Sequence, residues 1–162
     1  MDVRRFLATV GLLFGLAGVV YGQSGGAASK VTWAVEGDTL APGEAGAVTL
    51  RASIADGWKM YAPDSPPPTV GVSVTTVEAA RLAVSNEMDY TGASTTYDPH
   101  FGKEVHFFSG EARLRLPVSS PDDVPSGSYS LQGTLRFMVC TDEICLPPAT
   151  ESLEATMVIA RP

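Results

Sequence analysis

The strongest constraint on this fold is a series of short segments in which apolar residues occupy every second position. These segments are Val31–Val35, Val48–Ile54, Val70–Val74, Leu82–Val84, Ala112–Leu116, Leu131–Val139 and Leu153–Ile159. Such alternation is typical of strands with one buried face, and no segment shows a convincing helical period. Gly, Pro, Asp and Ser bound each segment, as expected of turns. Seven or more strands must bury their apolar faces against one another, so the sequence predicts an all-β protein with a two-sheet antiparallel sandwich.

Residues 1–22 have the pattern of a secretory signal peptide. Arg4 and Arg5 precede an uncharged, mostly apolar run, and small residues stand at the expected cleavage point near Gly22. The alternative is a transmembrane anchor, but the run is short for a bilayer and rich in glycine, which favours cleavage. We therefore expect an exported protein that is soluble once the signal peptide is removed.

The rest of the chain has the size and charge of one acidic domain. We expect a flexible leader at residues 23–29 and a single domain over residues 30–162. Removing residues 1–22 changes the formal charge from −7 to −8 over 140 residues. A domain of this size buries roughly two-thirds of its unfolded surface and needs no disulfide for stability. The negative charge argues against nucleic acid and anionic membrane surfaces as partners.

Cys140 and Cys145 are the only cysteines, and the pattern places them on one hairpin. The apolar alternation of the preceding strand puts Val139 on the core face, so Cys140 should point away from the core. Residues 141–144 then form a four-residue turn that brings Cys145 opposite Cys140. Directly opposed residues have Cα atoms about 4.5 to 5.5 Å apart, a separation that a disulfide can bridge.

The spacing of the two cysteines leaves open whether their disulfide is structural or redox-active. Closing so short a loop stabilises the fold by only about 2 kcal/mol, which is a modest structural contribution. Asp142 and Glu143 in the turn should raise the thiol pKa values, because nearby carboxylates disfavour a thiolate. The reduced pair is then expected to be a weakly nucleophilic dithiol that keeps its electrons until a partner docks. An inert staple is the alternative, and it is common in small exported domains.

Three stretches of the chain resemble one known family, the N-terminal periplasmic domain of the transmembrane thiol–disulfide interchange protein DsbD. They are Cys140–Thr150 with its Pro-Pro after the second cysteine, Gly57–Tyr61 with the proline-rich loop that follows, and Asp98–Lys103. The resemblance implies an immunoglobulin-like sandwich whose two cysteines shuttle electrons as a thiol–disulfide oxidoreductase. It also implies that Cys145 forms mixed disulfides and that Cys140 resolves them.

The resemblance further implies the partners of the domain. In the family, a thioredoxin-like domain fed through the membrane reduces this domain, which then reduces periplasmic thiol proteins, including those of cytochrome c biogenesis. This chain ends at Pro162, just after its last strand. We therefore expect thioredoxin-like partners and a separate membrane electron donor, with no cofactor and no nucleic acid.

A cap loop that shields the disulfide with an aromatic ring is also implied by the resemblance. The corresponding segment begins at Asp98, and either His100 or Phe101 offers the ring. The segment departs from the family pattern because Pro99 replaces the second residue of an acidic pair. The turn between the two cysteines also departs from it, since it is one residue shorter. The supporting residues expected around the disulfide are Tyr61, Tyr97, Asp98, His100, Phe101, Asp142 and Glu143.

Two other functions compete with the redox interpretation. The first is a non-catalytic immunoglobulin-like binding module that keeps the disulfide as a staple. The second is a metal site built from His100, His106 and the cysteines. Neither zinc-type CxxC spacing nor a His after the cysteines, as in blue-copper sandwiches, is present, so no metal is expected. His106 is expected on a solvent-facing side of its strand.

Overall fold

The computed structural model describes residues 26–99 and 101–161. Most of these residues form strands, and a short 3-10 turn, η1 (Ala27–Lys30), precedes the first strand. η1 overlaps the expected leader at 23–29, and its Ala27 side chain is buried in the core. The expected signal peptide lies outside the described residues. Within the described ranges, no helix is long and apolar enough to span a membrane.

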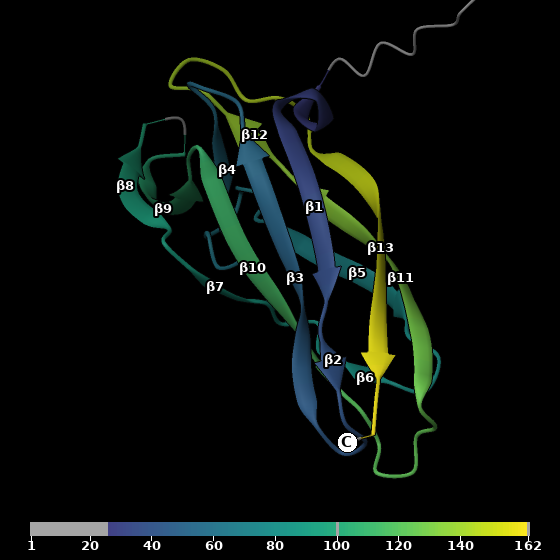
Figure 1. The fold of residues 1–162 in the computed structure, drawn as a ribbon. Coiled ribbons are helices and arrows are strands. Elements are labelled where there is room, and N and C mark those ends of the chain that lie inside the picture. Colours follow the sequence, from purple (N-terminus) through teal and green to yellow (C-terminus); the bar gives the residue numbers. More distant parts are fainter. Residues whose placement is uncertain (1–25, 100, 162) are drawn as a thin grey trace, which may run out of the picture.

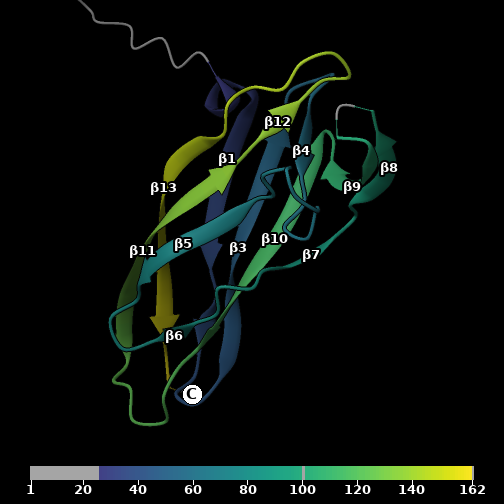
Figure 2. The ribbon, with the colours of Figure 1, turned by 180° about the vertical axis from the view of Figure 1, so that it is seen from behind.

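Two sheets form the body of the protein. The first has the order β1-β3-β10-β6, with β7 also paired to β10, and consists of β1 (Val31–Gly37), β3 (Ala45–Ile54), β6 (Ala83–Val84), β7 (Asp89–Thr91) and β10 (Glu111–Ser119). The second has the order β2-β13-β11-β5 and consists of β2 (Thr39–Leu40), β5 (Ser73–Glu78), β11 (Gly127–Phe137) and β13 (Ala149–Ile159). All pairings are antiparallel except that of β2 with β13. The two sheets lie one behind the other (Figures 1 and 2).

The apolar faces of the two sheets meet in one core. Leu50 and Leu114 from the first sheet and Leu131 from the second are almost completely buried. The Trp33 ring on β1 and the Phe137 ring on β11 make an edge-to-face contact, with centroids 5.4 Å apart, between the sheets. Residues along β10 and β13 alternate between buried and exposed. The predicted all-β sandwich is therefore confirmed.

A third, smaller sheet completes the fold and was not anticipated. It has the order β12-β4-β9-β8 and consists of β4 (Lys59–Tyr61), β8 (Ser94–Asp98), β9 (Lys103–Phe108) and β12 (Val139–Cys140). One of its faces adds Met60, Phe108 and Val139 to the main core. The other face carries a separate apolar cluster of Tyr61, Val105, Met138 and Cys140.

The third sheet changes two of the expected strands. The segment expected to run to Val139 is divided, because β11 ends at Phe137 and the chain then pairs with β4 as β12. The strand expected from Val70 begins only at Ser73. The reason is that the Val72 N–H donates to the Tyr61 carbonyl, 3.0 Å away, instead of joining the second sheet.

Replacing Phe137 by Ala should destabilise the fold strongly. The Phe137 side chain is fully buried between the two sheets, and deleting a buried Phe typically costs about 3–5 kcal/mol. Urea unfolding of the oxidised protein measures this loss. Val158→Ala is the matched control, since Val158 is 38% exposed and should change the unfolding free energy by less than about 0.5 kcal/mol. Equal effects of the two substitutions would contradict this description of the core.

Candidate functional site

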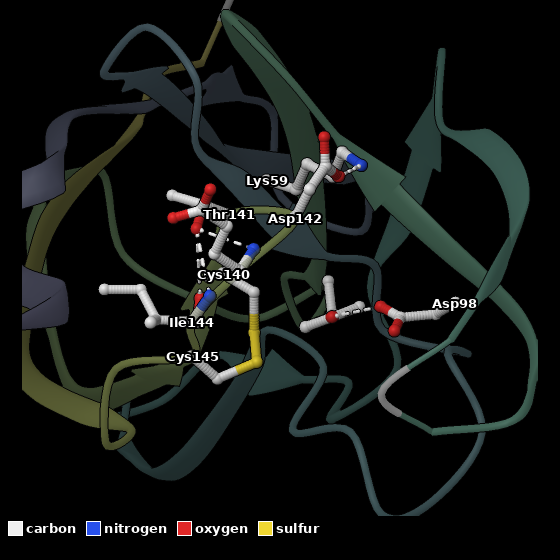
Figure 3. Close-up of polar contacts among 9 residues, drawn as sticks. Lys59, Asp98, Cys140, Thr141, Asp142, Ile144 and Cys145 are labelled. Atoms are coloured by element: carbon white, nitrogen blue, oxygen red, sulfur yellow. Dashed lines mark hydrogen bonds and ion pairs between the residues drawn. A yellow bond between two sulfur atoms is a disulfide. The ribbon is translucent and has the colours of Figure 1, made fainter.

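Cys140 and Cys145 form a disulfide across a tight hairpin (Figure 3). The two residues face each other in an isolated antiparallel bridge. The flanking bonds run from the Thr141 N–H to the Ile144 carbonyl, 2.8 Å, and from the Leu146 N–H to the Val139 carbonyl, 3.0 Å. The cysteines therefore occupy a non-hydrogen-bonded pair, the position where opposed side chains come closest. Their Cα atoms are 4.0 Å apart, slightly closer than expected, and the predicted pairing is confirmed.

The turn between the cysteines is held by its own first residue and by a lysine from another strand. The Thr141 hydroxyl oxygen accepts hydrogen bonds from the backbone N–H groups of Glu143 and Ile144, both at 3.1 Å. The Lys59 ammonium of β4 lies 2.5 Å from a carboxylate oxygen of Asp142. Glu143 is exposed at the tip of the turn. Sequence reasoning missed Lys59, because only the pairing of β4 with β12 brings it to the turn.

The two cysteines of the disulfide have different environments. Cys140 is 1% exposed and belongs to the second apolar cluster. Cys145, after the turn, is an exposed residue. Cys140 lies off the main core face, as the strand alternation predicts, and it is packed within the second cluster. The route from solvent to the disulfide therefore leads to Cys145.

The cover over Cys140 consists mainly of aromatic residues. Tyr61 lies in the same cluster, and the Phe101 ring packs against that cluster from the tip of the β8–β9 hairpin. The Tyr61 and Phe101 rings meet edge to face at 5.8 Å. His100, the other expected shielding residue, lies outside the described residues. Tyr97 is not part of this cluster, because its side chain is 62% exposed on the opposite side of β8 from Asp98.

A buried hydrogen bond joins the β8–β9 hairpin to the floor of the site. The Tyr61 hydroxyl donates to an Asp98 carboxylate oxygen at 2.8 Å, and both residues are buried. Burial, and then the hydrogen bond to the Asp98 carboxylate, raise the pKa of Tyr61 well above its usual value. Tyr61 therefore stays a neutral donor. The sequence pointed to both residues but not to the bond between them.

A second polar cluster attaches the proline-rich loop to β9. The His106 Nδ1 atom lies 2.9 Å from one carboxylate oxygen of Asp64, and the Tyr90 hydroxyl donates to the other. Burial opposes ionisation of Asp64, but the hydrogen bonds from Tyr90 and His106 outweigh it and lower the pKa of this carboxyl group. His106 thus meets Asp64 rather than the cysteines. Among the described residues, no group of three or more His, Cys, Asp or Glu side chains is arranged to hold a metal ion.

One family model matches most of the chain. The family model described as "Thiol:disulfide interchange protein DsbD, N-terminal" matches residues 30–156. Similar solved structures include the reduced DsbD N-terminal domain of Neisseria meningitidis, at 20% identity and a TM-score of 0.45, covering 67% of this chain and 74% of that chain. The N-terminal periplasmic domain of ScsB from Proteus mirabilis shows 18% identity and a TM-score of 0.48, covering 76% of this chain and 44% of that chain.

A third similar structure is the complex between the DsbD N-terminal and PilB N-terminal domains of Neisseria meningitidis. It has 18% identity and a TM-score of 0.47, covering 76% of this chain and 80% of that chain. The search of curated proteins finds no match. The assignment to a family therefore rests on the family model, whose matched range includes both cysteines and the whole of the third sheet.

Replacing Tyr61 by Phe should destabilise the protein by about 2 kcal/mol at pH 7, because the buried Asp98 carboxylate loses a hydrogen-bond donor. The folded state raises the pKa of Tyr61 above its ordinary value of 10.0. The contribution of the hydroxyl is therefore complete below about pH 10 and declines at higher pH. Chemical unfolding of both proteins between pH 7 and pH 11 measures this difference. Tyr97→Phe, which changes an exposed hydroxyl, should have almost no effect; equal losses in the two variants would refute the buried bond.

Proposed function

This chain belongs to the family of the DsbD N-terminal domain, and we propose that it passes electrons between thioredoxin-like partners through its Cys140–Cys145 disulfide. Family membership makes it a thiol–disulfide interchange domain. The observation that carries the finer proposal is the asymmetry of the disulfide, with Cys145 exposed and Cys140 buried. A purely structural staple has no need of one accessible and one protected sulfur.

Reduction of the domain begins when a donor thiolate attacks the Cys145 sulfur. A new disulfide forms between the donor and Cys145, the Cys140–Cys145 bond breaks, and its electron pair leaves on the Cys140 sulfur as a thiolate. The second thiol of the donor then attacks the mixed disulfide. The donor leaves oxidised, and the domain keeps two electrons as a dithiol.

Delivery of the electrons uses the same two sulfurs in the reverse order. The Cys145 thiolate attacks the disulfide of an oxidised partner, and one partner sulfur leaves as a thiolate. The Cys140 thiolate then attacks the Cys145 sulfur, which re-forms the intramolecular disulfide and releases the reduced partner. Cys145 is therefore the attacking residue and Cys140 the resolving residue, in accord with their exposure.

The residues around the disulfide control access to it. In our proposal, Phe101 and Tyr61 shield the Cys140 side, and the Tyr61–Asp98 bond holds the covering hairpin in place. His100, Asp142 and Glu143 are proposed to support the same cap and turn. The exposed ring of Tyr97 is proposed to meet the surface of a docked partner rather than the disulfide itself.

We also propose where this exchange takes place. Residues 1–22 direct export and are removed, and residues 30–162 then act as the interchange domain in the periplasm. The electron donor is a separate membrane protein that acts through a thioredoxin-like domain. The acceptors are thioredoxin-like proteins, including those that prepare cytochromes c for haem attachment. No cofactor is required, because the two sulfurs carry the electrons.

The reduction potential of the disulfide tests this function against that of a structural staple. We expect a midpoint between about −180 and −270 mV, the range of working thioredoxin-like exchangers. Thiol trapping in glutathione buffers of graded composition measures the midpoint. A midpoint below about −300 mV indicates a resistant structural bond and would support the non-catalytic binding module instead.

Single-cysteine variants test the roles of the two sulfurs. Cys140→Ser should accumulate a mixed disulfide with a thioredoxin whose resolving cysteine is replaced by Ser, because the attacking thiol is kept and the resolving thiol is lost. Cys145→Ser should trap at least tenfold less, since its remaining thiol is buried. The single active-site thiol of the thioredoxin variant is first converted to a mixed disulfide with thionitrobenzoate, so that attack by the domain thiolate forms the protein–protein disulfide and releases thionitrobenzoate. Non-reducing gel electrophoresis after mixing this activated thioredoxin with each reduced protein measures the trapped fraction. Equal trapping through the two residues would contradict the assignment.

A further inference from the structure

Lys59 lies next to the disulfide on the face of the third sheet that carries the second cluster. It pairs directly with Cys140 in the β4–β12 ladder, where opposed Cβ atoms are about 4.5–5.5 Å apart. The Lys59 ammonium lies over the Phe107 ring, 5.1 Å from its centroid, and its side chain is 31% exposed. The same ammonium binds the Asp142 carboxylate of the cysteine turn at 2.5 Å (Figure 3).

The other charged groups around the disulfide are mostly negative. The turn supplies Asp142 and Glu143, and β8 supplies Asp98, which accepts the Tyr61 hydrogen bond. On β9, the Lys103 ammonium binds the Pro67 carbonyl, and Glu104 and His106 alternate with the cluster residues Val105 and Phe107. Among the described ion pairs, the one that reaches the cysteine turn is formed by Lys59.

Opening of the disulfide creates a negative charge at a buried position. Attack on Cys145 sends the electron pair to the Cys140 sulfur, in a residue that is 1% exposed. Burial disfavours a thiolate, and so does the nearby Asp142 carboxylate, whereas a nearby cation favours it. A leaving thiol with a lower pKa leaves faster, so this local charge balance affects the exchange rate.

We propose that Lys59 is a positioning residue for disulfide exchange, whose ammonium compensates the Asp142 carboxylate and so stabilises the thiolate that leaves on Cys140. This inference rests on the proposed function, because it concerns the same disulfide. The proposal is distinguished from a structural role by the sign of the change in the Cys140 pKa when each charge is removed. Lys59 and Asp142 act on the Cys140 sulfur in opposite directions, although they are partners in one ion pair.

Titration of the Cys140 thiol tests this sign. In a Cys145→Ser background, thiolate absorbance against pH gives the pKa of Cys140 directly. Lys59→Met should raise this pKa by about 0.5 to 1 unit, and Asp142→Asn should lower it by a similar amount. If the ion pair only clamps the turn, breaking it from either side should move the pKa in the same direction. That result would overturn the proposal.

Two further variants separate charge from packing. Lys59→Arg keeps the positive charge and should leave the Cys140 pKa within about 0.3 unit of its original value. Lys30→Met is the matched control, because the Lys30 ammonium also lies over an aromatic ring, 5.2 Å from the Trp58 centroid, and the change in net charge is the same. Lys30→Met should leave the pKa unchanged. An equal shift in Lys30→Met and Lys59→Met would show only an effect of net charge and would overturn the proposal.

The rate of disulfide opening by dithiothreitol gives a second measurement that needs no protein partner. Lys59→Met should slow opening about threefold, and Asp142→Asn should accelerate it, because the rate follows part of the change in leaving-thiol pKa. Unchanged rates and unchanged pKa values in a protein that still exchanges with thioredoxin would overturn the role of Lys59 alone. A wild-type disulfide that resists thioredoxin altogether would instead overturn the proposed function.

Discussion

The candidate site depends on the pairing of β12 with β4, which joins Val139 to Met60 and Cys140 to Lys59. At Met138 the chain leaves the second sheet of the sandwich and enters the third sheet. Phe137 and Val139 remain in the main core, while Met138 and Cys140 face a separate cluster. This change of sheet anchors the hairpin on a closely packed core and still leaves its turn and second cysteine at the surface.

The chemistry of the disulfide follows from that arrangement. A cross-strand pair on a regular surface strand would expose both sulfurs similarly. Here the third sheet and the tip of the β8–β9 hairpin enclose Cys140, and Cys145 lies beyond the turn in solvent. The same sheet brings Lys59 to Asp142 and Tyr61 to Asp98. These polar contacts thus connect β4, β8 and the cysteine turn around the disulfide.

The sequence predicted the sandwich but not the third sheet, and the difference has a physical reason. Long strands such as β10 and β13 bury every second side chain, so the alternation of apolar and polar residues is visible in the sequence. β8 is an edge strand whose residues from Ser94 to Tyr97 are polar or exposed, and β4 has only three residues. Neither strand has a readable period, because β8 buries no side chain before Asp98 and β4 is too short, and the partners of β4 are distant in the chain. For the same reason, the sequence identified Tyr61 and Asp98 but could not pair them, and it did not indicate Lys59.

The sequence by itself determined the all-β sandwich, the face on which Cys140 lies and the disulfide across the four-residue turn. These features depend on period-two alternation and on residues only a few positions apart, so local geometry suffices. Only the tertiary structure decided that Cys140 is buried while Cys145 is exposed, and that Lys59 and Asp98 are neighbours of the site. Burial and ion pairing depend on which strands meet, and contacts such as that between Lys59 and Asp142 join residues 83 positions apart.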